Sequence, residues 1–346
     1  MDHLTIKDIA RLSGSSVSTV SRVLNNHPDV SEAMRKRVME VVGVNHFVPN
    51  NSARNLVIRE SDLVAVVVRG IGNPFFSRII KTAGPAIYGR GYSMSLHQIG
   101  SSQDEVMTAA LLEREKRLRG ILFLGGRFNY TPDEVAMLHV PFVCCTYTNT
   151  FGALDRSKYS SVAIDDRAEA MRAVNYLIDN GHTRIAALVE RRDGSSISQL
   201  RYEGYREALA RRGLSVEEGL VECAGSFSME DAYSAAKRLM ERERFTALFA
   251  ISDSMAMAAM KALHDGGRAI PRDCSVIAID GIEHTGFCIP TLTTLEQPAD
   301  ELALKSVEIL ASLLEEQPCR PHVPHRHVFM ETRLREGGSV ARLSAD

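Results

Sequence analysis

The stretch that decides the fold of the N-terminal part is TIKDIARLSGSSVSTVSRVLN, residues 5–25. Thr5 with Asp8 three residues later forms a capping-box pattern, which predicts the start of a helix. Gly14 then breaks the helical spacing, and Ser16 predicts the cap of a second helix with regularly spaced valines. Two helices joined by a short turn that contains glycine are the helix-turn-helix plan.

The segment that follows predicts a third helix and then a hinge. Ser31 is the expected cap of the third helix, and we expect residues 1–49 to form an all-α head. Pro49 ends this unit. Residues 50–60 can form only one or two helical turns, which are too short to be stable alone, so we expect a hinge that orders with a partner.

The remaining sequence alternates short apolar runs with amphipathic helical stretches. This texture predicts an α/β core of two lobes, each built on a doubly wound parallel sheet. We expect the core to span residues 61–340, with lobes at about 61–160 and 162–290 and a crossover back to the first lobe at about 291–320. Ligands bind such sheets at the carboxyl ends of the strands, so a cleft between the lobes is the expected site. The predicted strands are 63–68, 93–97, 120–124, 142–146, 162–164, 185–189, 246–251 and 275–279.

Composition limits the function classes without choosing among them. The formal net charge is −2, and residues 1–60 carry eight Lys/Arg against six Asp/Glu, an excess too small to argue nucleic-acid binding by itself. The six cysteines form no C-x-x-C pair, which favours a reducing cytoplasm and argues against a zinc site. The early acids and the lack of a long apolar run predict a protein that is neither exported nor bound to a membrane.

Several spaced motifs in order resemble the lactose-repressor (LacI/GalR) family, and the resemblance extends over residues 4–335. It implies a periplasmic-binding-protein-like core and a ligand-responsive, sequence-specific DNA-binding regulator, most often a repressor of a carbohydrate-utilisation operon. The motifs are Thr5 to Ala10, Val17 to Asn25, Asp29-Val30-Ser31, Pro49-Asn50-x-x-Ala53-Arg54-x-Leu56, Asn73-Pro74-Phe75-Phe76, Gly181-His182-x-Arg184-Ile185, Arg201-x-x-Gly204-Tyr205, Ser252-Asp253-x-Met255-Ala256 and Pro290-x-Leu292-Thr293-Thr294.

The second helix has the chemistry of a recognition helix. Val17 can touch a thymine methyl group, Ser18 can read donor or acceptor edges, and Arg22 can bond guanine. Small hydroxyls beside them can hold phosphates and set the register. The alternative is that the serines are only caps and Arg22 is a solvated charge. The predicted DNA-binding residues are Thr5, Ser16, Val17, Ser18, Thr19, Ser21, Arg22, Asn25, Ser31, Ala53 and Leu56.

The resemblance also gives the hinge a role. In the family, paired hinge helices enter the minor groove and a leucine from each wedges between base pairs; Leu56 has that position here. The alternative is that Leu56 packs on the core. A symmetric wedge implies a homodimer on a pseudo-palindromic operator, with a tetramer left open.

For the cleft, the resemblance implies effector contacts at Phe75, Thr146, Arg201, Phe227, Asp253 and Asp280. This set suits a polyhydroxylated ligand, because Arg201 and Asp280 can bond hydroxyls while the aromatic rings stack on an apolar face. As alternatives, Phe75 and Phe227 belong to the core, and Asp253 caps a helix. The sequence departs from the family at Ser252, Thr146-Tyr147 and Gly281, all pocket positions, which leaves the identity of the ligand open. The resemblance implies a sugar or sugar derivative as the commonest effector class, with a purine or another metabolite as the alternative.

Other function classes fit less well. Gly70-x-Gly72-x-x-Phe75 lacks the third glycine of a dinucleotide fingerprint, and no catalytic motif is present, so we expect no enzyme and no cofactor. His322, His325 and His327 lie beside prolines and predict a loop and no metal site. A solute-binding receptor shares the two-lobed core, but it would have a signal peptide and would lack the helix-turn-helix head. The sequence shows the reverse on both counts. A purely architectural DNA-binding protein would leave the large core without a use.

Overall fold

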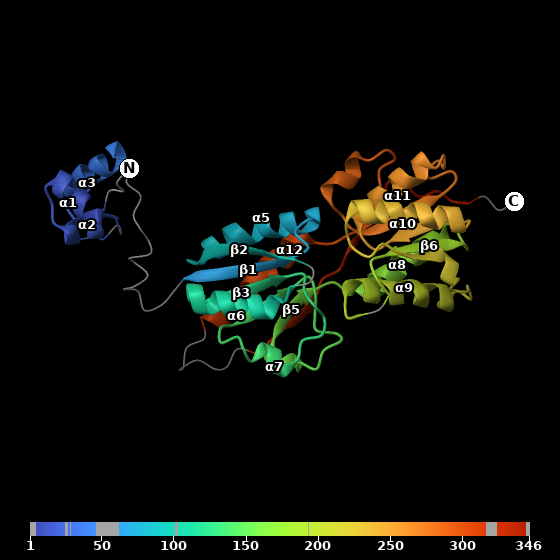
Figure 1. Cartoon of the computed structure of the whole chain (residues 1–346), viewed down its shortest axis with the longest axis horizontal. Coiled ribbons are helices and arrows are strands. Elements are labelled where there is room, and N and C mark those ends of the chain that lie inside the picture. The colour runs from blue at the N-terminus through green and yellow to red at the C-terminus, as the bar shows by residue number, and fades with distance from the viewer. Residues whose placement is uncertain are drawn as a thin grey trace. The chain divides into compact units, whose positions relative to one another are not determined.

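The computed structural model describes residues 5–24, 27, 29–45, 62–100, 103–192, 194–315 and 324–343. The chain divides into two compact units, residues 1–61 and 62–346 (Figure 1). The predicted hinge at residues 50–60 lies outside the described residues.

The described residues of the first unit form the helices α1 (Ile6–Ser13), α2 (Val17–Leu24) and α3 (Glu32–Val44). At the start of α1, the Asp8 carboxylate accepts hydrogen bonds from the backbone N–H and the hydroxyl of Thr5, at 2.9 and 2.7 Å. Gly14 ends α1 with a φ of +60°, a backbone conformation that glycine adopts without a steric penalty. The helices enclose a small apolar core of Ile9, Ala10, Val20, Val23 and Val38.

The two predicted serine caps behave differently. The Ser16 hydroxyl accepts the backbone N–H of Thr19 at 3.1 Å, which confirms the cap of α2. Ser31 stands at the N-cap position of α3, but its hydroxyl makes no capping bond. The predicted N-cap position of Ser31 is therefore confirmed, but its side chain adds no capping hydrogen bond, because the correct position does not ensure the capping rotamer.

The second unit begins with a lobe built on a six-stranded sheet in the order β11-β5-β4-β3-β1-β2, with every neighbouring pair parallel. Helices α5 and α12 cover one face and α6 the other, so the central strands are buried on both sides. The elements are β1 (Leu63–Arg69), α5 (Pro74–Tyr88), β2 (Ser93–Ile99), α6 (Glu105–Lys116), β3 (Gly120–Leu124), α7 (Pro132–Val135), β4 (Phe142–Cys145), β5 (Ser160–Ala163), α12 (Ala299–Leu314) and β11 (His327–Phe329).

The other lobe repeats this plan in the order β12-β10-β9-β8-β6-β7, with only β12 antiparallel to its neighbour. The sheets confirm the predicted fold class of two doubly wound lobes. Strand β7 was not predicted, because its three residues give too short an apolar signal. The elements are α8 (Asp166–Asp179), β6 (Ile185–Val189), α9 (Ile197–Arg211), β7 (Val221–Cys223), α10 (Met229–Arg242), β8 (Ala247–Ala250), α11 (Asp253–Asp265), β9 (Ser275–Asp280), β10 (Thr293–Glu296) and β12 (Arg333–Arg335).

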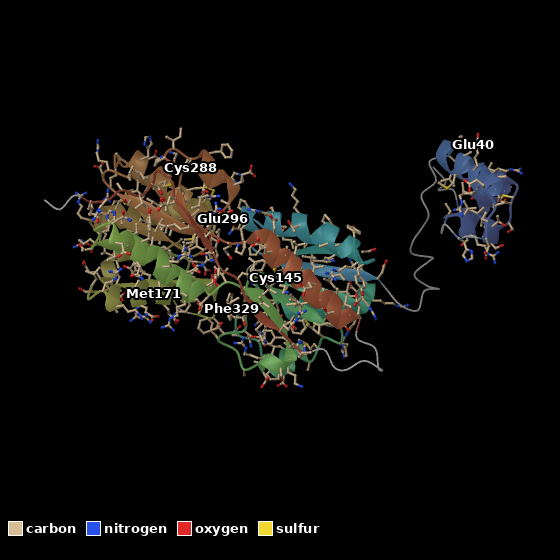
Figure 2. All side chains as sticks on the ribbon, turned by 180° about the vertical axis from the view of Figure 1, so that it is seen from behind. Glu40, Cys145, Met171, Cys288, Glu296 and Phe329 are labelled. Carbon is tan, nitrogen blue, oxygen red and sulfur yellow. The ribbon has the colours of Figure 1, made fainter. Side chains whose placement is uncertain are left out.

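The chain passes between the lobes three times. It leaves the first lobe after β5, returns between β10 and α12, and leaves again between β11 and β12. The crossover expected from residue 291 starts only at Gln297, because β10 still pairs with β9. Figure 2 shows Glu296 and Phe329 at this junction, whereas Cys145 lies inside the first lobe. The strands β11 and β12, only three residues apart in the sequence, thus belong to different sheets.

Candidate DNA interface and effector site

Helix α2 turns one mixed face toward solvent. Val20 and Val23 are buried in the head core, which leaves Val17, Ser18 and Arg22 exposed on the opposite side. A branched alkyl group, a hydroxyl and a guanidinium on one helix face are suited to contacts with base edges in a major groove. The exposure of these three side chains agrees with the predicted recognition face.

Ser16 joins the turn to this face. Its hydroxyl lies 2.7 and 2.8 Å from the hydroxyls of Ser18 and Thr19, in addition to capping the helix. Thr5 and Ser31 are exposed, and Thr19 and Ser21 are partly buried. All of these hydroxyls lie at helix starts or on α2, where phosphate contacts are common. Three further predicted DNA contacts, Asn25, Ala53 and Leu56, lie outside the described residues.

A buried polar centre lies at the carboxyl ends of the second-lobe strands. Arg201, on α9, is only 2% exposed. Its Nε and Nη2 atoms lie 2.9 Å from an Asp166 oxygen, and its Nη1 atom lies 3.3 Å from Asp280 Oδ1 and donates to the Ile251 carbonyl. The structure therefore brings together the two predicted effector residues Arg201 and Asp280, and it adds Asp166, which the sequence analysis did not select.

Asp280 also links the two lobes. Its Oδ2 atom accepts a hydrogen bond of 2.9 Å from the amide of Asn73, which is the N-cap residue of α5 in the first lobe. Its Oδ1 atom accepts one of 2.9 Å from Gln297 in the crossover segment. The carboxylate of Asp280 thus receives donors from both lobes and from the connection between them.

The centre holds more acids than bases. Asp166, Asp253 and Asp280 are all buried, with Arg201 as the buried guanidinium among them. Burial raises the pKa of Asp166 to about 6 against the effect of Arg201, and burial together with the Asp280 charge raises the pKa of Asp253 to about 7. The pKa of Asp280 is also raised, by burial. Proton uptake by this cluster near neutral pH relieves the excess negative charge.

Within this cluster, Asp253 makes no hydrogen bond or ion pair with Arg201. Its carboxylate accepts the backbone N–H groups of Gly281 and Ile282 and the hydroxyl of Thr294. The alternative in which Asp253 caps α11 is wrong, because Ser252 is the N-cap residue and accepts the backbone N–H of Met255.

The other predicted effector residues have different environments. Phe75 is 5% exposed and packs in the first-lobe core, as the alternative interpretation has it, whereas Phe227 is 39% exposed and outside the core clusters. Thr146 is buried with a φ of +76°, and its hydroxyl accepts the backbone N–H of Gly125 at 3.3 Å. Of the six predicted effector residues, only Arg201 and Asp280 therefore interact with each other directly, through an ion pair.

Apolar side chains that neighbour Asp280 and Arg201 in the sequence also join the two lobes. Ile282, from the second lobe, is part of the first-lobe core cluster that contains Phe75. On the other side, Leu200 of α9 joins the cluster of Phe128 and Tyr147, and the Phe128 N–H donates to the Ser195 carbonyl at 3.3 Å. Apolar packing thus flanks the polar link between Asn73 and Asp280.

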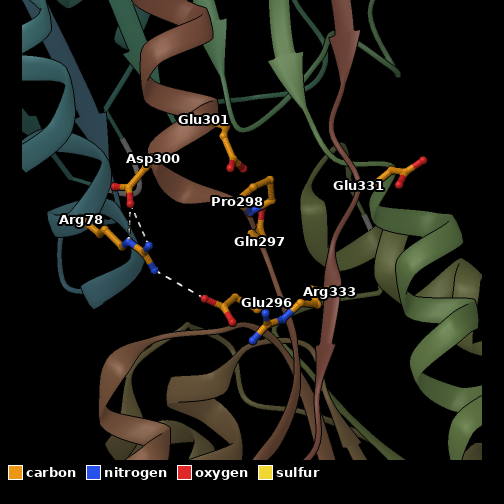
Figure 3. Close-up of a pocket in the computed structure, with 8 residues that line it drawn as sticks. All are labelled: Arg78, Glu296, Gln297, Pro298, Asp300, Glu301, Glu331 and Arg333. Atoms are coloured by element: carbon orange, nitrogen blue, oxygen red, sulfur yellow. Dashed lines mark hydrogen bonds and ion pairs between the residues drawn. The ribbon is translucent and has the colours of Figure 1, made fainter.

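A separate polar pocket of about 280 Å³ lies at the crossover segments (Figure 3). There Arg78 of α5 is 2.8 Å from Asp300 of α12 and 3.6 Å from Glu296 at the end of β10. The second pair connects the lobes. This pocket contains neither Arg201 nor Asp280, but it adjoins the polar centre, because Gln297 lines the pocket and also donates to Asp280. Its lining residues are Arg78, Glu296, Gln297, Pro298, Asp300, Glu301, Glu331 and Arg333.

Comparisons with known proteins identify the family. Residues 5–50 match the model of bacterial regulatory proteins of the lacI family, and residues 174–340 match a periplasmic binding protein-like domain. The chain is 38% identical to the HTH-type transcriptional regulator MalR of Clostridium butyricum over 339 residues, 97% of this chain and 99% of that protein. The chain belongs to the lacI family. It is a DNA-binding transcriptional regulator.

Other lacI-family proteins resemble it along the whole chain. The ribose operon repressor of Escherichia coli K12 is 31% identical over 97% of this chain and 99% of its own. A transcriptional regulator CelR–cellobiose complex has a TM-score of 0.71 at 27% identity, covering 97% of this chain and 99% of that one. The lac repressor dimer bound to operator has a TM-score of 0.76 and covers 98% and 100%, and at 23% identity it supports the fold alone.

The sequence analysis did not identify three residues that bond Arg201 or Asp280 in the polar centre. Asn73 was within a quoted motif but had no assigned role, and Asp166 and Gln297 had no signal beyond their position beside predicted crossovers.

In the described ranges, no helix is long and apolar enough to cross a membrane. The same ranges contain no group of three His, Cys, Asp or Glu residues placed to hold a metal ion.

Proposed function

We propose that this regulator represses a carbohydrate-utilisation operon. It binds a pseudo-palindromic operator as a homodimer through the exposed face of α2, and it binds a sugar or sugar derivative at the polar centre of Arg201 and Asp280. The observation that carries the effector part is this centre: a buried guanidinium and a buried carboxylate, beside an amide from the opposite lobe, offer paired donors and acceptors to vicinal hydroxyls.

The names of the relatives support the sugar class. The ribose operon repressor and the CelR–cellobiose complex, whose names include a sugar, each match this chain over 97% of its length. A purine stays the second candidate, as the pocket positions that depart from the family pattern leave the identity of the ligand open.

The surface of the second lobe supports the homodimer. Phe287 and Ile289, between β9 and β10, are 81% and 99% exposed. Large apolar side chains in contact with water mark interaction surfaces, and a twofold pair of heads requires a self-complementary surface. We assign these two residues to the contact with a second copy of the chain.

The effector and the DNA are coupled through the lobes. A ligand that bonds Asp280 changes the environment of Asn73, and hence the contact between the first lobe, which follows the hinge, and the second. The free energy that couples effector binding to operator binding is roughly 1–3 kcal/mol in typical allosteric proteins. The direction, induction or corepression, follows from which state the ligand prefers.

The experiment is selection of DNA from random sequence by the purified full-length protein. The selected site is then titrated in the presence of D-ribose, maltose, cellobiose, hypoxanthine or guanine. A palindromic site whose affinity changes with a sugar supports the proposal, and a response to a purine only supports the second candidate. A selected site that responds to none of them contradicts the effector assignment and leaves DNA binding intact.

A further inference from the structure

The Asp253 side chain is enclosed in the second lobe, at the first residue of α11. It is fully buried, and its hydrogen bonds are to the segment that follows β9 and to β10. One oxygen, Oδ2, accepts the backbone N–H groups of Gly281 at 2.7 Å and Ile282 at 2.8 Å, and Oδ1 accepts the Thr294 hydroxyl at 2.6 Å. The carboxylate therefore holds two consecutive peptide groups and ties them to the next strand.

These peptide groups belong to an unusual turn. Asp280, the residue just before them, has a φ of +144°, and Gly281 has a φ of +77°. Positive φ is rare for a residue with a side chain, and it persists only where surrounding contacts impose it. The hydrogen bonds to Asp253 are such contacts, because they fix the two peptide groups that follow Asp280.

The turn is confined from its other side as well. A Cβ atom at Gly281 would collide with Glu296, so β10 lies directly against the backbone there. Between Asp253 and Glu296 the turn has little freedom to move. Its confinement directs the Asp280 carboxylate toward Arg201 and Asn73, at 3.3 and 2.9 Å.

We propose that Asp253 is a positioning residue for effector recognition and makes no effector contact of its own. It holds the turn at residues 280–282 so that the Asp280 carboxylate faces the space between the lobes. This inference rests on the proposed function, in which Asp280 bonds the effector. It replaces the direct contact at Asp253 that the family resemblance implies.

The chemistry requires a carboxylate at this position. Two N–H groups and one O–H group point at Asp253, and a carboxylate is acceptor-only with two oxygens. An asparagine of the same size offers one acceptor oxygen, and its NH₂ group would face a donor. Helix capping does not explain the residue, because the Ser252 hydroxyl already caps α11.

The test compares three variants of the full-length protein with wild type. Asp253→Asn breaks the clamp, and Thr294→Val removes only its third hydrogen bond. Ser228→Ala is the matched control, since it deletes a helix cap in the same lobe, at α10, without touching the turn. Two properties are measured: hydrogen exchange of the Gly281 and Ile282 amides without ligand, and the shift in operator affinity produced by D-ribose, maltose or cellobiose.

We expect Asp253→Asn to speed exchange of both amides at least tenfold. The same variant raises the sugar concentration for half-maximal response at least tenfold and keeps the sugar-free operator affinity within twofold of wild type. Thr294→Val has a smaller effect of the same sign, about threefold, and Ser228→Ala responds as wild type does.

A response of Asp253→Asn equal to wild type would overturn the inference while the proposed function stands. If Asp253→Asn does not fold, Thr294→Val decides, and a wild-type response in that variant overturns the inference. A wild-type protein that ignores all three sugars overturns the sugar assignment first and this inference with it, so the two failures are distinguished by the wild-type titration.

Discussion

The recognition helix of the head and the polar centre of the core use their polar side chains in opposite ways. On α2, Ser18 and Arg22 are exposed and open to a macromolecular partner. In the core, Arg201 and Asp280 are buried and bonded to other residues of the chain. An exposed polar group is solvated until DNA replaces the water, whereas a buried one needs internal partners. Ser18 and Arg22 can thus be changed with little effect on stability, whereas Arg201 and Asp280 cannot.

The largest effect is expected from removing the guanidinium of the centre. Arg201→Met leaves the Asp166 and Asp280 carboxylates buried without their cation, so the free energy of unfolding should fall by about 3–5 kcal/mol. Urea denaturation followed by circular dichroism measures it. Arg211→Met is the control, because it removes an exposed ion pair with Glu207 on the same helix. We expect it to lower the free energy of unfolding by less than about 1 kcal/mol. An equal loss of unfolding free energy in both variants would show that burial does not make Arg201 more important for stability than Arg211.

The recognition helix should show the reverse behaviour. Arg22→Ala removes an exposed side chain that we expect to bond a base, so binding to the selected operator weakens by roughly 1–3 kcal/mol and discrimination at one base pair is lost. The free energy of unfolding stays within about 0.5 kcal/mol of wild type. Competition binding with single-base operator variants checks the effect. A uniform loss over all sequences would make Arg22 a phosphate contact.

The acidic centre should make the stability of the core depend on pH. Asp166 and Asp253 have folded-state pKa values of about 6 and about 7, above the ordinary value for aspartate, so the folded state binds protons more tightly than the unfolded state. Their contribution is complete below about pH 4 and is lost as the pH rises through 6 to 7. We expect a loss on the order of 2 kcal/mol between pH 5 and pH 8.

Urea denaturation at both pH values measures this loss. Asp166→Asn removes one titrating group and should reduce the difference, whereas Asp155→Asn, at an exposed turn, should not. A wild-type protein that is more stable at pH 8 than at pH 5 would contradict the pKa directions.

The exposed apolar pair tests the dimer. Ile289→Asp places a charge where we expect contact with a second copy, so the dimer dissociation constant should rise at least tenfold, about 1.4 kcal/mol. Sedimentation equilibrium measures it. Leu111→Asp, an exposed leucine on α6 in the first lobe, serves for comparison. Dimerisation that survives Ile289→Asp unchanged would place the interface elsewhere.

The smallest effect separates the two serines at helix starts in the head. Ser16→Ala removes an observed cap and should cost about 1 kcal/mol, whereas Ser31→Ala removes no capping bond and should cost under about 0.5 kcal/mol. Thermal unfolding of the two variants, followed at the head transition, compares them directly. Equal costs would mean that the Ser31 hydroxyl caps α3 in solution.

The sequence could predict what depends on local pattern. Helices α1 and α2, the turn at Gly14 and most of the strands follow from spacing and from residues with a strong local preference. Residues that depend on tertiary contacts could not be predicted in the same way. Asp166 follows β5, Asn73 begins α5 and Gln297 follows β10, and only folding brings them to Arg201 and Asp280.

Two aromatic residues show the same limit at the site. The sequence analysis left Phe75 and Phe227 each open between core and effector contact, because a phenylalanine has no local signature of its burial. In the structure Phe75 is buried beside the first-lobe sheet and Phe227 is exposed. The clamp at Asp253 also depends on peptide groups 28 and 29 residues away, so no local pattern could indicate it.

We propose above all that one chain couples DNA binding at the exposed face of α2 to effector binding at the buried centre around Asp280. The most direct measurement is operator affinity of wild type and of Asp280→Asn, with and without the sugar that shifts the wild type. We predict that the sugar changes wild-type affinity by roughly 5- to 150-fold and leaves Asp280→Asn unchanged, with equal affinities in its absence. An Asp280→Asn protein that responds to the sugar as wild type does would contradict the account.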